Sequence, residues 1–137
     1  MMMPAVRIPM FRILTLVALA FALLLPAKEV TAQVTAFRQA VAESAASDAA
    51  LAEFYRARAF EGIWTGSSGR DLARRTALLA AFSEAGSHGL PAGRYDPEAV
   101  MVQLRGTTTP AAQGRIEVEL SRLFLQYARD IETGVLV

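Results

Sequence analysis

The stretch PAAQGRIEVELSRLFLQYARDI, residues 110–131, decides the fold of this chain of 137 residues. Its apolar residues recur every three or four positions, which is the period of an α-helix with one buried face. The expected buried stripe consists of Ile116, Leu120, Leu123, Phe124, Tyr127 and Ile131. The opposite, polar face carries Arg115, Glu119, Arg122, Gln126 and Asp130. Because that face mixes both signs of charge, the stripe is expected to pack on a core rather than on a membrane surface.

The sequence before this helix also has helical periodicity, and no stretch alternates as a strand does. Helices are predicted over residues 35–58, 68–86 and 97–105, and the first can be two helices divided at Ser47-Asp48. Capping patterns mark the helix starts at Ser47-Asp48, Ser68 with Asp71, Asp96-Pro97 and Thr109-Pro110. Gly86 is expected to end the helix over 68–86. The prediction is an all-α small bundle of four to five helices, preceded by a signal peptide.

Residues 1–32 have the layout of a secretory signal peptide. Arg7 and Arg12 precede an uncharged run, ILTLVALAFALLL, over residues 13–25, and Val30-Thr31-Ala32 offers small or modest residues before a cut. Cleavage is predicted near Ala32; the alternative is an uncleaved anchor, although a membrane span needs roughly 20 apolar residues. In both cases residues 33–137 are exported, and the arginine-rich composition fits a bacterium, so the expected location is the periplasm.

The composition excludes several kinds of site. The chain has no cysteine, so it can form no disulfide, thiolate zinc site, iron–sulfur cluster or thiol nucleophile. Its one histidine, His88, leaves little for a metal site or a catalytic triad. Without the charges of residues 1–32, the chain carries 11 positive and 12 negative groups, which does not suggest a nucleic-acid partner. No catalytic, cofactor-binding or metal-binding residue is therefore expected.

The order of aromatic motifs along residues 33–137 resembles a known family. FYRAR at 54–58 is followed by Phe60 and by GIW at 62–64; ALLAAF at 77–82 leads to HGL at 88–90 and YD at 95–96; FLQYARD occupies 124–130. This order, behind a signal peptide, resembles the N-terminal scaffold domain of the YcbB-type L,D-transpeptidases. The signature residues are Phe54, Tyr55, Trp64, Leu79, Phe82, Gly89, Leu90, Tyr95, Leu123, Phe124 and Tyr127.

The resemblance implies a role in cell wall biogenesis. In that family a helical scaffold precedes a catalytic domain that makes 3-3 cross-links in peptidoglycan, with a cysteine nucleophile in a Ser-His-Gly-Cys motif. Here Ser87-His88-Gly89 is followed by Leu90, so the motif lacks its thiol and His88 is expected to be a structural loop residue. The resemblance therefore implies a non-catalytic scaffold, present as a fragment or a truncated chain without the catalytic domain. Its implied partner is that missing domain or another cell-wall enzyme, with peptidoglycan as a further candidate, and the membrane only through an uncleaved signal segment.

Other interpretations remain open from the residues. The apolar end, Val135-Leu136-Val137, suits a free-standing periplasmic adaptor that docks on cell-wall enzymes. A lytic enzyme would need two facing carboxylates, and Glu117 and Glu119, two apart on a helix, point to different faces. Tyr55, Trp64 and Tyr95 are interpreted as loop anchors on the core rather than as a sugar-stacking platform, and the Gly-rich segment 59–69 as a connector rather than a phosphate loop. If the domain is cut short, part of the stripe on helix 110–131 is expected to lie uncovered.

Overall fold

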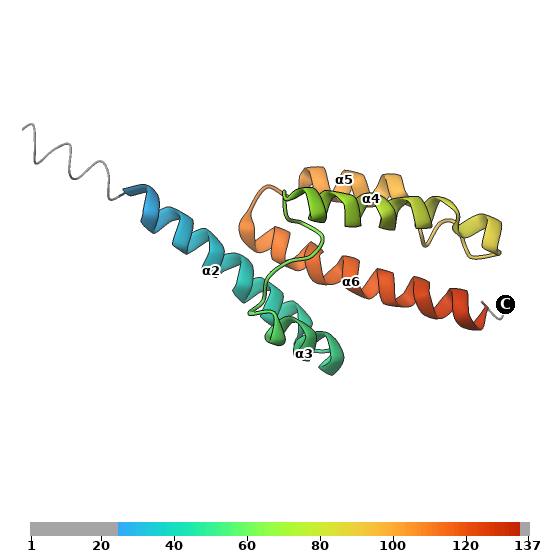
Figure 1. Ribbon diagram of the computed structural model, residues 1–137, viewed down its shortest axis with the longest axis horizontal. Helices are drawn as coiled ribbons and strands as arrows, with labels where there is room; N and C mark the ends of the chain where they lie inside the picture. Colours follow the sequence, from blue (N-terminus) through green and yellow to red (C-terminus); the bar gives the residue numbers. More distant parts are fainter. Residues whose placement is uncertain (1–24, 135–137) are drawn as a thin grey trace, which may run out of the picture. The chain divides into compact units, whose positions relative to one another are not determined.

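The computed structural model describes residues 25–134, which are helical apart from their connections (Figure 1). The elements are α2 (Leu25–Ala45), α3 (Ala49–Ala57), α4 (Gly69–Ser83), the 3-10 helix η1 (Ala85–His88), α5 (Pro97–Gly106) and α6 (Pro110–Thr133). No strand occurs in this range. The predicted all-α bundle is therefore confirmed.

The chain divides into two compact units, residues 1–33 and residues 34–137. In the first unit only the start of α2 is described; the apolar run over 13–24 lies outside the described residues, and the predicted cut near Ala32 stays a prediction. Within residues 25–134, no helix has the length and apolar character needed to cross a membrane. All packing described below lies within residues 34–134.

Short polar side chains cap the N-termini of α3, α4, α5 and α6 at the positions predicted from the sequence. Asp48 accepts hydrogen bonds from the backbone N–H groups of Ala50 and Leu51, so it divides α2 from α3. Ser68 caps α4 by accepting from the Asp71 N–H, while its hydroxyl donates to the Asp71 carboxylate at 2.6 Å. Asp96 caps α5, and Thr109 caps α6. Each cap satisfies backbone donors that have no partner inside the helix.

The end of α4 differs from the prediction that Gly86 stops it. The α-helix ends at Ser83, the chain continues as the 3-10 turn η1, and the left-handed residue is Gly89, with φ of 75°. Ala85 and Leu90 are both buried in the core, and the Leu90 N–H donates to the Ala85 carbonyl at 3.0 Å. The chain therefore tightens so that both side chains enter the core, and only after that does it reverse at a glycine.

Two hydrophobic cores share α6. The larger core joins α4, α5 and the connector before α4 to α6, and its buried members are Trp64, Leu78, Phe82, Ala85, Leu90, Tyr95, Val100, Ile116 and Leu120. The smaller core joins α2 and α3 to α6 through Val41, Ala45, Leu51, Tyr55 and Val118. Since α6 contributes to both cores, it is the central helix of residues 34–134.

A glycine allows α2 and α6 to approach closely. A Cβ atom built on Gly114 would lie 2.5 Å from the carbonyl oxygen of Phe37 and 2.8 Å from the Cβ of Ala40. Both contacts are shorter than real carbon atoms permit, so this position accepts only glycine without a shift of the helices. Gly114 thus fixes the spacing at which α2 closes the smaller core.

The stripe of α6 is buried over only part of its length. Ile116 and Leu120 are buried, and Leu123 and Tyr127 pack against the larger core. By contrast, Phe124 is 42% exposed and Ile131 is 43% exposed. Part of the apolar face is thus uncovered.

One residue of the predicted polar face lies inside. Asp130 is buried, and its carboxylate accepts hydrogen bonds from the Tyr95 hydroxyl, from Arg94 at 3.0 Å and from Gln126 at 2.8 Å, which replace the water that it loses. The hydrogen bond from Tyr95, followed by those from Gln126 and Arg94, holds the pKa of Asp130 below its ordinary value of 3.8. This carboxylate ties the loop before α5 to the C-terminal half of α6.

Candidate functional site

The connector between α3 and α4 folds over α6, and two left-handed residues turn it in that direction. Ala59 and Phe60 have φ of 52° and 59°, a conformation that costs free energy in residues other than glycine. The Phe60 N–H donates to the Tyr55 carbonyl at 2.7 Å, and Phe60 packs against the smaller core. This packing offsets the strain and directs residues 62–66 across α6.

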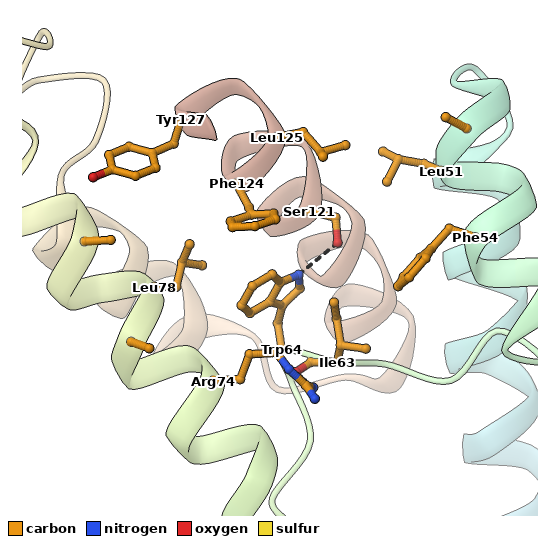
Figure 2. Close-up of a pocket in the computed structure, with 13 residues that line it drawn as sticks. Leu51, Phe54, Ile63, Trp64, Arg74, Leu78, Ser121, Phe124, Leu125 and Tyr127 are labelled. Carbon is orange, nitrogen blue, oxygen red and sulfur yellow. Dashed lines mark hydrogen bonds between the residues drawn. The ribbon is translucent and has the colours of Figure 1, made fainter. Parts of the chain in front are cut away.

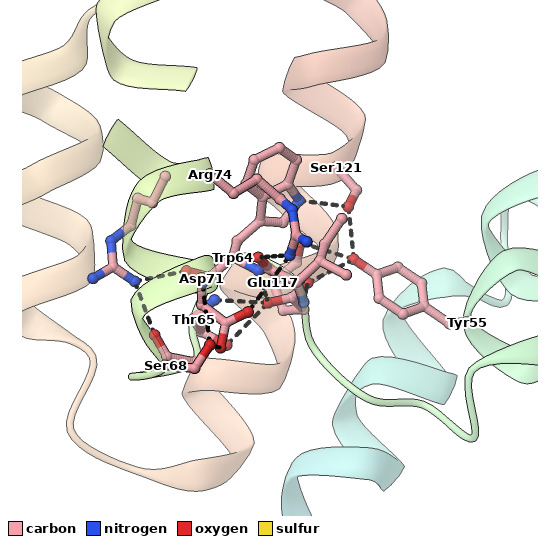
Figure 3. A network of polar contacts seen from close by, with 11 residues as sticks. Tyr55, Trp64, Thr65, Ser68, Asp71, Arg74, Glu117 and Ser121 are labelled. Atoms are coloured by element: carbon pink, nitrogen blue, oxygen red, sulfur yellow. Dashed lines mark hydrogen bonds and ion pairs between the residues drawn. The ribbon is translucent and has the colours of Figure 1, made fainter. Parts of the chain in front are cut away.

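The carboxylate of Glu117 holds that connector by its backbone (Figure 3). It accepts hydrogen bonds from the consecutive N–H groups of Ile63, Trp64 and Thr65, at 2.7, 3.0 and 2.9 Å, and from the Thr65 hydroxyl at 2.9 Å. Gly62 leaves room for it, since a Cβ there would lie 2.9 Å from Glu117 Oε2. Glu117 is fully buried, so these bonds replace the water that the carboxylate loses on folding.

Three further side chains, from α3, the connector and α6, complete the network. The Tyr55 hydroxyl lies 2.9 Å from Glu117 Oε1, to which it donates, and 2.6 Å from Ser121 Oγ. The indole N–H of Trp64 donates to the same Ser121 oxygen at 2.8 Å. Burial, and next the negative charge of Glu117, raise the pKa of Tyr55 well above its ordinary value of 10.0. No buried side-chain nitrogen or oxygen in the described part of the chain lacks a partner.

Helix α4 binds the carbonyl side of the same connector. Arg74 donates to the Ile63 carbonyl at 2.7 Å, and Arg75 donates to the Trp64 carbonyl at 2.6 Å. Arg74 also lies 3.5 Å from Asp71. The peptide groups of residues 63–65 are thus held between the carboxylate on α6 and two guanidinium groups on α4, which fixes the position of Trp64.

An apolar groove of about 590 Å³ opens above this network (Figure 2). One wall comes from α3, with Ala50, Leu51 and Phe54; the other comes from α4, with Arg74, Ala77, Leu78 and Ala81; the floor comes from α6 and the connector, with Ser121, Phe124, Leu125, Tyr127, Ile63 and Trp64. Phe54 is 41% exposed on its wall, and the rings of Trp64 and Phe124 lie 5.7 Å apart on the floor. The polar network therefore fixes the floor of a surface groove that is almost entirely apolar.

The structure divides the signature residues between the groove and the larger core. Phe54, Trp64, Phe124 and Tyr127 line the groove. Phe82, Tyr95 and Tyr127 form an aromatic cluster with ring centroids 5.2–5.4 Å apart. Leu90 is buried in the larger core, and Leu79 and Leu123 pack against it. Tyr55 lies in the smaller core, and Gly89 supplies the left-handed turn after η1.

The aromatic residues weighed as a sugar platform are not exposed together. Tyr55, Trp64 and Tyr95 are each buried, at 0%, 4% and 1% exposure. They anchor three different segments to α6 through the hydroxyl and indole hydrogen bonds described above. His88 is exposed at the end of η1.

Sequence reasoning missed the role of Glu117, which it weighed only as a poor acid/base partner of Glu119. The prediction that the two residues point to different faces is correct, since Glu119 is exposed. A signal was present in the sequence: the small residues Gly114 and Ser121 lie three and four positions from Glu117, on the same face of the helix. Small residues on one face of a helix leave room for another segment to approach closely. This face points to the smaller core and the connector.

The network around Glu117 holds the connector in place. The Glu117 carboxylate is enclosed and occupied by donors of the chain itself, so it is not placed to exchange protons with a substrate. In residues 25–134, no three His, Asp or Glu side chains gather where a metal ion would bind. The groove between α3 and α4, by contrast, is accessible, and its lining is almost entirely apolar.

Comparison with protein families gives a match. A family model described as Scaffold domain matches residues 49–137, more than half of the chain, from the start of α3 onward. No curated protein and no solved structure matches the chain. The matched range contains both walls and the floor of the groove, together with all the residues of the Glu117 network.

Proposed function

The chain belongs to the Scaffold domain family, and we propose that it is the helical, non-catalytic scaffold of a periplasmic L,D-transpeptidase, with which this membership is consistent. In this role it takes part in the 3-3 cross-linking of peptidoglycan by holding the enzyme that performs it. The observation that carries the proposal is the family match over residues 49–137.

Two features of the site support a holding role. The buried polar groups of Glu117, Tyr55 and Ser121 are committed to one another and to the connector, so they stabilise the fold and leave no group free to react. The groove, in contrast, leaves Phe54 and Phe124 each about two-fifths exposed. Apolar side chains that gather in an accessible groove are typical of binding sites, which supports a holding role.

The absence of a cysteine gives the first test. The purified chain is incubated with peptidoglycan that carries tetrapeptide stems, and the digested products are analysed by liquid chromatography and mass spectrometry. The expected result is no 3-3 cross-linked product above a sample without protein, because no thiolate is present to form the acyl-enzyme. An active L,D-transpeptidase serves as the positive control. Cross-links made by the chain alone would refute the scaffold role.

A second test separates the scaffold from a free-standing adaptor. The DNA that follows the codon of Val137 is sequenced in the organism that encodes the chain. A frame that continues into a domain with Ser-His-Gly-Cys supports the scaffold of a transpeptidase. A stop codon at that point, together with a folded monomeric product, supports the adaptor instead. Cell fractionation then tests the periplasmic location, which predicts the chain in the fraction released by osmotic shock.

A further inference from the structure

A second, smaller cleft, of about 240 Å³, opens where α4, α5, α6 and the connector meet. Its lining mixes polar and apolar side chains, unlike that of the groove between α3 and α4. The lining residues are Thr65 from the connector, Arg75 from α4, Met101, Leu104 and Arg105 from α5, Thr107 from the turn after α5, and Gln113 and Ile116 from α6. Sites for small ligands have this composition, because a few polar groups among apolar ones orient the ligand.

The charged groups that line this cleft are both positive. Arg75 and Arg105 line it, and no carboxylate among the described residues does. Neither guanidinium group forms an ion pair with a carboxylate of residues 25–134. The Glu117 carboxylate is fully buried and does not line the cleft, and the Thr65 hydroxyl donates to it at 2.9 Å. The cleft therefore offers two cations whose charge no lining group balances, which favours an anionic ligand.

Three side chains of the cleft keep N–H groups that the described part of the fold does not use. Arg75 donates through one nitrogen, Nη1, to the Trp64 carbonyl at 2.6 Å and to the Gly66 carbonyl at 3.4 Å, which leaves its Nε and Nη2 donors. The side chains of Arg105 and Gln113 donate to no described group. Because the bonds to the two carbonyls already hold Arg75 in place, this side chain loses little freedom when it binds a ligand.

The rest of the lining restricts the kind of anion. Met101 and Leu104 are half-buried and Ile116 is buried, so aliphatic carbon lies beside the two guanidinium groups. Inorganic phosphate has no apolar part that could cover this carbon. A carboxylate on a short aliphatic body has one, and its two oxygens match the planar fork of N–H groups that an arginine presents.

We propose that this cleft binds a small organic carboxylate with a short aliphatic body. The carboxylate accepts hydrogen bonds from Arg75, Arg105 and Gln113, and the aliphatic body covers Met101 and Leu104. The proposal goes beyond the scaffold function and does not rest on it, because it uses only the charge and the lining of the cleft.

Titration of the purified, isotope-labelled chain, followed by nuclear magnetic resonance, tests the proposal with N-acetylvaline as the probe. Two comparison ligands separate its parts: N-acetylvalinamide has nearly the same shape without the charge, and inorganic phosphate has charge without an aliphatic body. With N-acetylvaline, the backbone amide signals of residues around the cleft, such as Leu104 and Gln113, are expected to shift with a dissociation constant of about 1–5 mM. Both comparison ligands are expected to bind at least about fivefold more weakly.

A pair of variants tests the role of the charge. Arg105→Gln removes one cation at an exposed position and is expected to raise the dissociation constant of N-acetylvaline about fivefold. Arg129→Gln removes the same charge from an exposed residue of α6 outside the cleft and is expected to leave the constant unchanged; spectra without ligand check that both variants fold. The proposal is overturned if either comparison ligand binds as tightly as N-acetylvaline, if the two variants have equal effects, if the shifted signals lie away from the cleft, or if no signal shifts.

Discussion

Glu117→Gln is expected to destabilise the chain by about 2–4 kcal/mol, although it removes no carbon atom from the interior. Glu117 Oε1 accepts from the Ile63 N–H and the Tyr55 hydroxyl, and Oε2 accepts from the Trp64 N–H and from the N–H and hydroxyl of Thr65. Glutamine replaces one oxygen by an NH₂ group, which can only donate. In either orientation, the NH₂ group meets at least one backbone N–H directly.

The size of the expected loss of stability depends on whether each donor can find another acceptor. The hydroxyls of Tyr55 and Thr65 can rotate, and Tyr55 has a second partner in Ser121, so they lose little. A backbone N–H cannot turn away, and one buried donor without a partner costs about 1–3 kcal/mol. The bonds that remain also weaken, because they lose the charge of the carboxylate. The relief of the carboxylate's own burial offsets part of this cost, which leaves the range given above.

Urea unfolding measures this difference. Trp64 is the single tryptophan of the chain and lies in the network, so its fluorescence reports the connector, while circular dichroism reports the helices. The midpoint for Glu117→Gln is expected to fall by about 1 M or more. Glu119→Gln, the same change on the exposed face of α6, is expected to stay within about 0.5 kcal/mol of the unchanged chain. Equal midpoints for the two variants would refute the reasoning.

Three further perturbations test other parts of the fold. Gly114→Ala places a Cβ atom 2.5 Å from a carbonyl oxygen of α2 and is expected to lower stability by about 1–3 kcal/mol in thermal unfolding, whereas Gly106→Ala, with open space around it, is expected to be neutral or slightly stabilising. Because the pKa of Tyr55 is raised above 10.0 in the folded state, its contribution is complete below pH 10 and is lost as the pH rises further; Tyr55→Phe should make the loss of stability above pH 10 less steep. Because the pKa of Asp130 is held below 3.8, its contribution is present above that pH and is lost as the pH falls; Asp130→Asn should flatten the acid side of the stability curve, and an unchanged slope would contradict the buried cluster.

The helices of this fold can be predicted because their signals are local. Asp48, Asp96 and Thr109 cap helices within three residues of themselves, and the stripe of α6 repeats at short spacing. The predicted end of α4 was wrong because Gly86 and Gly89 carry the same local signal for the end of a helix. The choice between them depends on where Ala85 and Leu90 meet the core.

The candidate site is less predictable because its partners are distant in sequence. The donors to Glu117 belong to residues that precede it in the chain by 52 to 62 positions. Three of these donors are backbone N–H groups, which leave no pattern in the side chains. Asp130 has the same difficulty, since Tyr95 lies 35 positions away. A buried carboxylate and an exposed one therefore look alike on a helix until the connector that covers one of them is placed.

Because both cores include residues of α6, the order in which the chain is synthesised limits when it can fold. The Tyr55–Glu117 bond spans 62 residues, and neither core is closed without side chains from residues 116–120. During synthesis, the segments that form α2 to α5 must therefore wait for α6 before either core can close. A chain interrupted before residue 110 would retain neither core, and a complete bundle is expected to gain and lose both in one cooperative step.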